Sequence, residues 1–556
     1  MFSTLAKRCA VLSGVLILSL VIRLQAQEIN LKPVTSTYVL RNVTVITSPG
    51  SVINDATLVI KDGLIHAVGT DVSVPVDAIP VDADSLTVYA GFIDGLSQTG
   101  IKQPKEDNNR NNIEDPGNPP NDLAGITPNK TIRENLEASE KSIGAMRQIG
   151  FTMSHVVPGN GMLPGKGSVV LLAGDGTDDM IFQENVSLFS TLNGARRMYP
   201  STVMGVMAKY REIYRNAELL KRNQGLYASN PSGMKRPGSD YVTEAFLPVL
   251  DGQLPVMFEA EGVKDVQRVM TLQEELGFKL MIAGIKQGWD VTDAIKSANI
   301  PVFLSLDLPE WEEDKKDSAA EEMSEEKKAL VERKNGILLN HYTLPAKWSD
   351  AGLRFGFSSM GAKSTDIHKV LTTMKEKGVS EDVLLAGLTT GPAALLGLSR
   401  VAGTVEPGKL ANLVVTHGNY FDKDAKVKYV FVEGEMFTYD SKPSKTKGDN
   451  ASASPEGTWS YSAETPNGTG KGEIILEKDG AGYTGKIQDG QTGYSFDLSN
   501  ILVDGSKLSF EFNYSDGSNQ FPLSVEIEIS GNTFSGLVDG GSIGSFPIEG
   551  TRVPEK

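Results

Sequence analysis

The chain has 556 residues, of which 54 are basic and 70 acidic, and it contains a single cysteine. Its net charge of −16 disfavours a generic nucleic-acid partner, because phosphate binding requires a surplus of Lys and Arg. One cysteine excludes an intrachain disulfide and any metal site built on several thiolates.

Residues 1–26 have the features of a signal peptide. Lys7 and Arg8 precede the apolar run "VLSGVLILSLVI", and small residues end the segment before Gln27. The run is short for a membrane span and no later run of that kind exists, so we expect no transmembrane segment in the mature chain. Cys9 falls inside the segment, which leaves the mature chain without cysteine. We therefore expect an exported protein, periplasmic or extracellular, whose acidic surface keeps it soluble.

Residues 27–90 are predicted to form the first part of a composite β-sandwich. The segments "YVLRNVTVIT", "ATLVIKDGLIHAVG" and "LTVYAGFID" alternate apolar and polar residues, and "SPG" and "KDG" suit hairpin turns.

Residues 91–401 alternate short apolar runs with helical stretches. The runs include "GFTMSHVV", "LPVMFEA", "FKLMIAG", "IPVFLSL" and "LRFGFSS". Between two of them, "GVKDVQRVMTLQEELGF" places Val266, Val269, Met270 and Leu272 on one side of a helix that ends at Gly277. This order predicts an α/β fold, a (β/α)₈ barrel of the TIM type.

Three further segments follow the predicted barrel. Residues 402–439 return to strands and are expected to complete the β-sandwich from the other flank of the chain. Residues 440–455 lack periodic apolar positions and are rich in Ser, Lys and Asn, which is typical of a linker. Residues 456–556 contain short alternating strands joined by Asp-Gly and Gly-Asn turns, which predicts an antiparallel meander or small barrel of the lipocalin or avidin kind.

Three segments give the chain a resemblance to a known family. "AGFIDGLSQTG" resembles the first-strand motif Gly-Phe-Ile-Asp-x-His-x-His, "GFTMSHVVPGNGMLPGKGSVVLLAG" resembles a Gly-Val-Thr-Thr segment with its glycine-rich loop, and "TTGPAALLGLSRVAGTVEPGKLANLVV" resembles a closing signature. Over residues 38–438 the chain thus resembles the amidohydrolase superfamily, in particular its exported imidazolonepropionase-like branch. That resemblance implies hydrolysis of C–N bonds by one or two divalent metals held by histidines and a carboxylate.

The positions that the family uses for metal ligands carry other residues in this chain. By resemblance, the first histidine pair falls on Leu96 and Gln98, the fifth-strand histidine on Glu259 and the sixth-strand histidine on Ala283. The eighth-strand aspartate falls on Met360. With a one-residue slip it falls on Ser359, and Lys166 and Lys209 are the candidates nearest to a carboxylated lysine. We therefore predict a degenerate site with no catalytic residue, no metal and no cofactor.

An alternative metal site could use the histidines that remain. His155 lies on a predicted barrel strand, His341 near another, and His368 on the helix after the last strand. A hydrogen-bonded core histidine is the preferred interpretation of His155, and Zn is expected only if the three rebuild a site. A metal-free nucleophile with a base beside it is a further alternative, with Ser358, Ser359 and Glu259 as strand-end candidates, although no Gly-x-Ser-x-Gly elbow surrounds those serines.

These observations lead to two hypotheses about function. The first is a non-catalytic partner subunit or binding protein, and the resemblance implies an oligomer, including a hetero-oligomer with an intact homologue. The second is a hydrolase that acts on a carbon–nitrogen bond of a cyclic, amide-like substrate through a non-standard site.

Overall fold

The structure is a computed structural model, and it forms two compact units, residues 1–441 and 442–556. The residues it describes are 37–102, 115–159, 161–238, 240–311, 325–439, 455–465, 468–479, 482–490, 493–504, 507–515, 520–539 and 545–553. The predicted signal peptide and all but the last residue of the predicted linker lie outside these residues. None of the helices in the described ranges combines the length and the apolar character needed to cross a bilayer.

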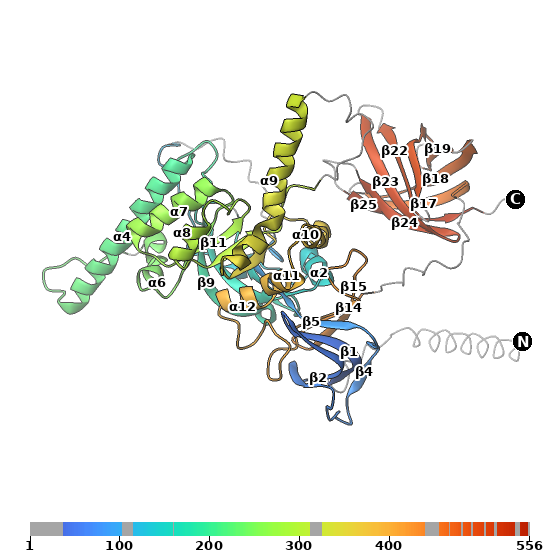
Figure 1. Cartoon of the computed structure of the whole chain (residues 1–556). Helices are drawn as coiled ribbons and strands as arrows, with labels where there is room; N and C mark the ends of the chain where they lie inside the picture. Colours follow the sequence, from blue (N-terminus) through green and yellow to red (C-terminus); the bar gives the residue numbers. More distant parts are fainter. Residues whose placement is uncertain are drawn as a thin grey trace, which may run out of the picture. The chain divides into compact units, whose positions relative to one another are not determined.

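An eight-stranded sheet is the centre of the first unit (Figure 1). Its strands follow one another in chain order: β6 (Phe92–Ser97), β7 (Phe151–Val156), β8 (Gly165–Leu171), β9 (Ile181–Thr191), β10 (Val256–Glu259), β11 (Leu280–Ile285), β12 (Val302–Ser305) and β13 (Phe355–Ser358). β13 lies beside β6, and the amide of Met360 donates to the carbonyl of Leu96 at 3.1 Å. The sheet therefore curls into a barrel, as expected.

One strand departs from the predicted (β/α)₈ pattern. β8 runs antiparallel to both β7 and β9, whereas the other neighbouring pairs in the sheet are parallel. Only residues 157–164 join β7 to β8, and residues 172–180 join β8 to β9. A parallel crossover needs a dozen or more residues, so connections of this length require a reversal of direction.

Helices cover the outer face of the barrel. The main ones are α2 (Lys141–Gln148), α4 (Val203–Ser229), α7 (Val263–Leu276), α8 (Thr292–Ser297), α9 (Glu325–Asp350), α10 (Ser364–Glu376), α11 (Glu381–Leu388) and α12 (Thr390–Leu395). The helix predicted before Gly277 is confirmed as α7. It buries Val266, Val269 and Leu272, and it ends because Gly277 adopts a left-handed conformation with φ of +82°.

The two flanks of the chain share one β-layer. β1 (Tyr38–Ser48), β2 (Ser51–Lys61), β3 (Leu64–Gly69), β4 (Ile79–Val81) and β5 (Thr87–Ala90) come from the first flank, and β14 (Leu413–His417), β15 (Lys426–Val432) and β16 (Glu435–Thr438) from the second. β5 pairs with β1 on one side and with β14 on the other. This bridging makes one continuous sheet from the two flanks of the chain.

The second unit is an antiparallel meander of nine strands. They are β17 (Gly457–Thr465), β18 (Gly468–Asp479), β19 (Gly482–Asp489), β20 (Ser495–Asp497), β21 (Ser499–Asp504), β22 (Lys507–Ser515), β23 (Gln520–Ser530), β24 (Thr533–Asp539) and β25 (Ser545–Arg552). The first strand pairs with the last, and β19 and β20 lie beside β21 and β22. Trp459, Phe510 and Phe534 are among the side chains that fill its interior. The β-rich C-terminal domain predicted from sequence is thus confirmed.

Close packing inside the first barrel predicts the effect of adding one methyl group. A Cβ at Gly95 on β6 would lie 2.0 Å from the ring of Phe303, which is fully buried. Gly95→Ala should therefore lower the free energy of unfolding by about 1–3 kcal/mol in urea titrations. Gly144→Ala in α2 is the matched control, since no atom lies within 4 Å of its added Cβ, and it should stabilise by up to about 1 kcal/mol. Equal effects of the two substitutions would contradict this packing.

Candidate functional site

The inward face of the barrel is set by the two-residue alternation of its strands. Met257 on β10 and Met281 on β11 pack in the interior cluster, whereas Phe258 and Ile282 pack outward against the helices. Glu259 is two residues after Met257, so it points to the same side, at the carboxyl end of β10. Ala283 is its register partner on β11 and belongs to the interior cluster. In parallel barrels, this end of the strands is where functional side chains gather.

The other three ligand positions lie at the same end of the barrel. Leu96, on β6, is fully buried in the interior cluster, and Met360, directly after β13, packs against that cluster. Gln98 is half-buried, and its side-chain amide donates to the carbonyl of Pro158 at 3.3 Å. Gln98 is thus held by the loop that follows β7.

The donor set at these positions does not fit a divalent metal. Leu96, Ala283 and Met360 are apolar and packed together with other interior side chains, and Gln98 offers at most a neutral amide. Glu259 is the one carboxylate of the set. A Zn site needs imidazole or carboxylate ligands in several coordination positions, so Glu259 alone is not enough. Within the described ranges, no group of three or more His, Cys, Asp or Glu side chains is arranged to hold a metal ion.

His155 is a fully buried side chain on β7 with both ring nitrogens occupied. Nδ1 donates to the carbonyl of Gly95 at 3.1 Å, and Nε2 accepts from the hydroxyl of Ser187 at 3.0 Å. Burial lowers the pKa of the ring to about 4, so it is neutral at physiological pH. Gly167 leaves the room for this ring, because a Cβ there would lie 2.5 Å from Nε2.

The structure does not bring His341 and His368 together with His155. Nδ1 of His341, on α9, donates to the carbonyl of Lys286 at 2.8 Å. Nε2 of His368, on α10, donates to the carbonyl of Tyr420 at 2.9 Å. Each of the three histidines is thus bound to a different element, which matches the absence of a metal cluster in the described ranges.

The remaining candidates are also dispersed. Lys166 lies on β8, where its backbone forms an isolated β-bridge with Thr131. Lys209 lies on α4 and forms an ion pair with Glu212 at 2.9 Å. Ser358 donates to the carbonyl of Leu96 at 2.9 Å, so its hydroxyl hydrogen is engaged in closing the barrel.

Lys286, which was not among the predicted site residues, lies beside Glu259. Nζ of Lys286, just after β11, binds Glu261 at 3.0 Å and Asp307 at 2.7 Å. Burial lowers the pKa of Lys286, but its hydrogen bonds to Asp307 and Glu261 outweigh burial and raise that pKa overall. Three acids on neighbouring strand ends and one lysine thus form a charged rim at this end of the barrel. Strand-end position was the available signal, because Lys286 and Asp307 each follow a predicted strand.

Glu259 is a half-buried member of this rim. Burial raises the pKa of its carboxyl, the nearby Glu261 raises it further, and Lys286 acts in the opposite direction. Its carboxylate accepts no hydrogen bond from the residues that the structure describes. The rim therefore offers a partly desolvated carboxyl group next to an ammonium group.

Asp94 is a fully buried acid that ties the first strand of the barrel to the last. Its carboxylate accepts the amide of Ser359 at 3.0 Å, the hydroxyl of the same serine, and the amide of Leu96 at 3.2 Å. Burial raises the pKa of Asp94 from 3.8 to about 7, although these three hydrogen bonds act to lower it. Ser359 is thus a structural partner of Asp94 in this arrangement.

Comparison with known proteins identifies a matching family and solved structures with a similar fold. Residues 308–437 match the amidohydrolase family. The crystal structure of an amidohydrolase from Thermotoga maritima MSB8 aligns with a TM-score of 0.59 and 21% identity over 72% of this chain and 100% of that one. A prolidase complexed with N-methylphosphonate-L-proline gives 0.44 and 17% over 73% and 100%, and a Xaa-Pro dipeptidase with bound methionine gives 0.41 and 15% over 72% and 100%. A comparison with curated proteins gave no match.

The raised pKa of Asp94 predicts a pH-dependent stability. Since the folded-state pKa of about 7 exceeds the ordinary value of 3.8, the stabilisation is fully present below pH 3.8 and is lost as pH rises through 7. Asp94→Asn removes this titration. Between about pH 4 and pH 8, the unfolding free energy of the wild type should fall by about 2–4 kcal/mol relative to Asp94→Asn, measured by urea denaturation. Parallel pH profiles for the two proteins would contradict the assignment.

Proposed function

Since residues 308–437 match the amidohydrolase family and the first unit shares its fold with a solved amidohydrolase, we propose that the chain is an amidohydrolase-superfamily protein whose barrel works without a catalytic metal. In this proposal it is a binding protein or the partner subunit of a catalytic homologue. The chain keeps the scaffold of a hydrolase and has exchanged the groups that carry the chemistry.

The filled end of the barrel is the observation that carries this proposal. A metal-dependent hydrolase needs an open, polar site in which a bound ion can lower the pKa of water. Here Leu96 and Ala283 are fully buried in the interior cluster and Met360 packs against it, so these three positions offer apolar side chains and no ligand atom for an ion. Single ligands can be compensated by neighbours, but a packed apolar surface leaves no coordination position.

The cellular setting belongs to the same proposal. Residues 1–26 carry the features of a signal peptide, so we place the protein outside the cytoplasm, in a bacterial periplasm or beyond it. An oligomer, including one with an intact homologue, is the state in which a barrel without catalytic ligands would keep a function.

A second candidate function rests on the charged rim. Glu259 has a raised pKa and lies beside Lys286, and a carboxyl group of this kind can act as a general acid or base. A hydrolase that acts on a cyclic amide-like bond through Glu259 would be the active alternative.

Elemental analysis tests the principal proposal. The mature chain, without a histidine tag, would be incubated with an excess of Zn²⁺ or Mn²⁺, separated from free ions by gel filtration and analysed by mass spectrometry. Because the five positions lack a ligand set, we expect well below one ion per chain, about 0.1 or less.

The ion content of the wild type tests the proposal, and His155→Ala tests whether any bound ion depends on that histidine. One or two ions per chain in the wild type would contradict the proposal, and their loss in His155→Ala would assign them to the alternative histidine site. An unchanged low content in both proteins supports a barrel without metal.

The rim candidate predicts a different result. If Glu259 is a general acid or base, Glu259→Gln should lower hydrolysis of cyclic amide and dipeptide substrates by about 100-fold, followed by chromatography of the products. Glu261→Gln is the matched control, because Glu261 belongs to the same rim and is more exposed. If the wild type itself hydrolyses none of these substrates, or if both variants behave alike, the second candidate fails.

A further inference from the structure

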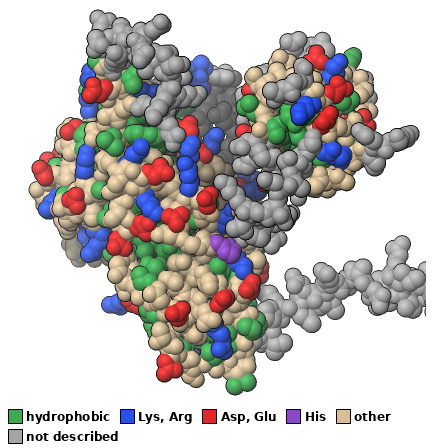
Figure 2. All heavy atoms as spheres, turned by 45° about the vertical axis from the view of Figure 1, so that its right-hand side comes forward, with side chains coloured by type: hydrophobic (Ala, Val, Ile, Leu, Met, Phe, Trp, Pro, Cys, Tyr) green, Lys and Arg blue, Asp and Glu red, His purple; other side chains and the backbone are tan. Residues whose placement is uncertain are grey.

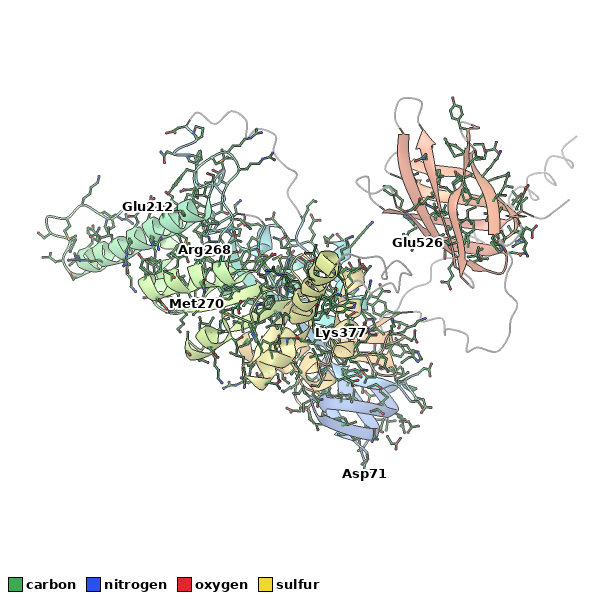
Figure 3. The ribbon with its side chains drawn as sticks, turned by 45° about the horizontal axis from the view of Figure 1, so that its top comes forward. Asp71, Glu212, Arg268, Met270, Lys377 and Glu526 are labelled. Carbon is green, nitrogen blue, oxygen red and sulfur yellow. The ribbon has the colours of Figure 1, made fainter. Side chains whose placement is uncertain are left out.

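Helix α4 extends beyond the barrel that it covers. Val206, Tyr210 and Ala217 in its first half are buried in the core between strands and helices. Arg211 binds Glu275 of α7 at 2.7 Å, which fixes this half against its neighbour. Figure 3 shows α4 and α7 side by side, with Glu212 labelled on the first helix and Arg268 and Met270 on the second.

The second half of α4 has no such support. After Ala217, none of its residues is buried, and its last ion pair to another element joins Lys221 to Asp251 at 2.5 Å. The helix nevertheless continues to Ser229, and the chain returns through an exposed segment before α5 (Tyr241–Glu244) begins. Figure 1 shows this end of α4 projecting away from the rest of the first unit. We call residues 218–238 the arm.

Apolar side chains gather on the arm. Leu219 is 56% exposed, Leu226 48% and Met234 37%. Leu219 and Leu226 are seven residues apart, so they lie on the same side of the helix, with Arg222 between them. Single exposed leucines are common on protein surfaces, but several on one projecting end of a helix form a surface suited to contact.

The arm is positively charged on an acidic protein. It contains Lys221, Arg222, Lys235 and Arg236, and its one acid is Glu218. Of the four cations, the three other than Lys221 form no ion pair with the residues that the structure describes. The face drawn in Figure 2 has acidic and basic side chains interspersed, which is the ordinary pattern for a soluble surface.

A shallow hollow lies at the base of the arm. It measures about 390 Å³ and is lined by Glu218, Lys221, Arg222, Gly225 and Leu250. Lys221, Arg222 and Leu250 could bind a ligand that has an anionic group and an attached apolar chain.

We propose that the arm docks on a surface of anionic phospholipid. Lys and Arg near such a surface are attracted by the headgroup phosphates, and the leucines and Met234 can enter the boundary between headgroups and acyl chains. The arm contributes +3 to the total of −16, so the remainder of the chain carries −19 and is repelled from the same surface, which would orient the chain with the arm toward the lipid.

Vesicle flotation tests this proposal. The mature chain, without residues 1–26, would be mixed with phosphatidylcholine vesicles, with and without about 30 mol% phosphatidylglycerol, at low and high salt. We expect binding only to the anionic vesicles, and loss of that binding as salt rises from about 0.05 M to about 0.5 M. Arg222→Glu combined with Lys235→Glu and Arg236→Glu should weaken binding at least about tenfold.

Two controls separate the arm from general effects of charge and apolar surface. Arg41→Glu with Arg354→Glu and Arg400→Glu makes the same change of net charge at other exposed positions and should bind like the wild type, apart from a small general loss. Leu226→Ser with Met234→Ser should also weaken binding several-fold.

Three results would overturn the proposal. The first is that the wild type does not float with anionic vesicles. The second is that the arm variant and its charge control lose vesicle binding to the same extent. The third is that the arm variants change their oligomeric state in the absence of lipid. The last result would identify the arm as a protein interface. Circular dichroism and thermal unfolding of each variant establish that it is folded, so a loss of binding reports on the arm.

Discussion

Close packing of the barrel interior is the constraint on which the rest of the first unit depends. Parallel strands place every second side chain inward, and these side chains must fill the enclosed space without voids. A metal site can replace part of that filling in an active hydrolase, because ions, waters and polar ligands occupy the open end. In this chain Leu96 and Ala283 are buried in the interior cluster and Met360 packs against it, so apolar groups line the interior there. A histidine placed at Leu96 would therefore have to disturb a packed core.

Closure of the barrel depends on polar contacts between β6 and β13. Asp94 binds the backbone and side chain of Ser359, while Ser358 and the amide of Met360 bind the carbonyl of Leu96. These contacts run between the first and last strands of the sheet, at the level where the ligand positions begin. Residues from "GFIDG" and "GFSSMG" thus hold the scaffold together, so these stretches have a structural role that does not depend on catalysis.

Much of this fold could be predicted from sequence, for identifiable reasons. The runs "LPVMFEA", "FKLMIAG" and "IPVFLSL" are buried on both faces, and such runs are recognisable as parallel strands. The sequence does not reveal the reversal of β8, because a glycine-rich loop after β7 does not by itself indicate a hairpin connection. The bond between Asp94 and Ser359 was missed because it joins residues 265 positions apart, and local patterns carry no information on such pairs. Met360 and Glu259 could be placed only by resemblance, and their inward direction follows from the alternation with Met257 and its neighbours.

The pairing of β17 with β25 in the second unit has a consequence for how that unit forms. The first and last strands of the meander are neighbours, so the ring of strands cannot close until the last strand is available. Contacts between residues this far apart in sequence are slow to form, because the intervening chain must be ordered at the same time. A chain synthesised from its N-terminal end would therefore complete this domain last. Loss of β25 would leave the edges of β17 and β24 without their partner and open to pairing with other chains.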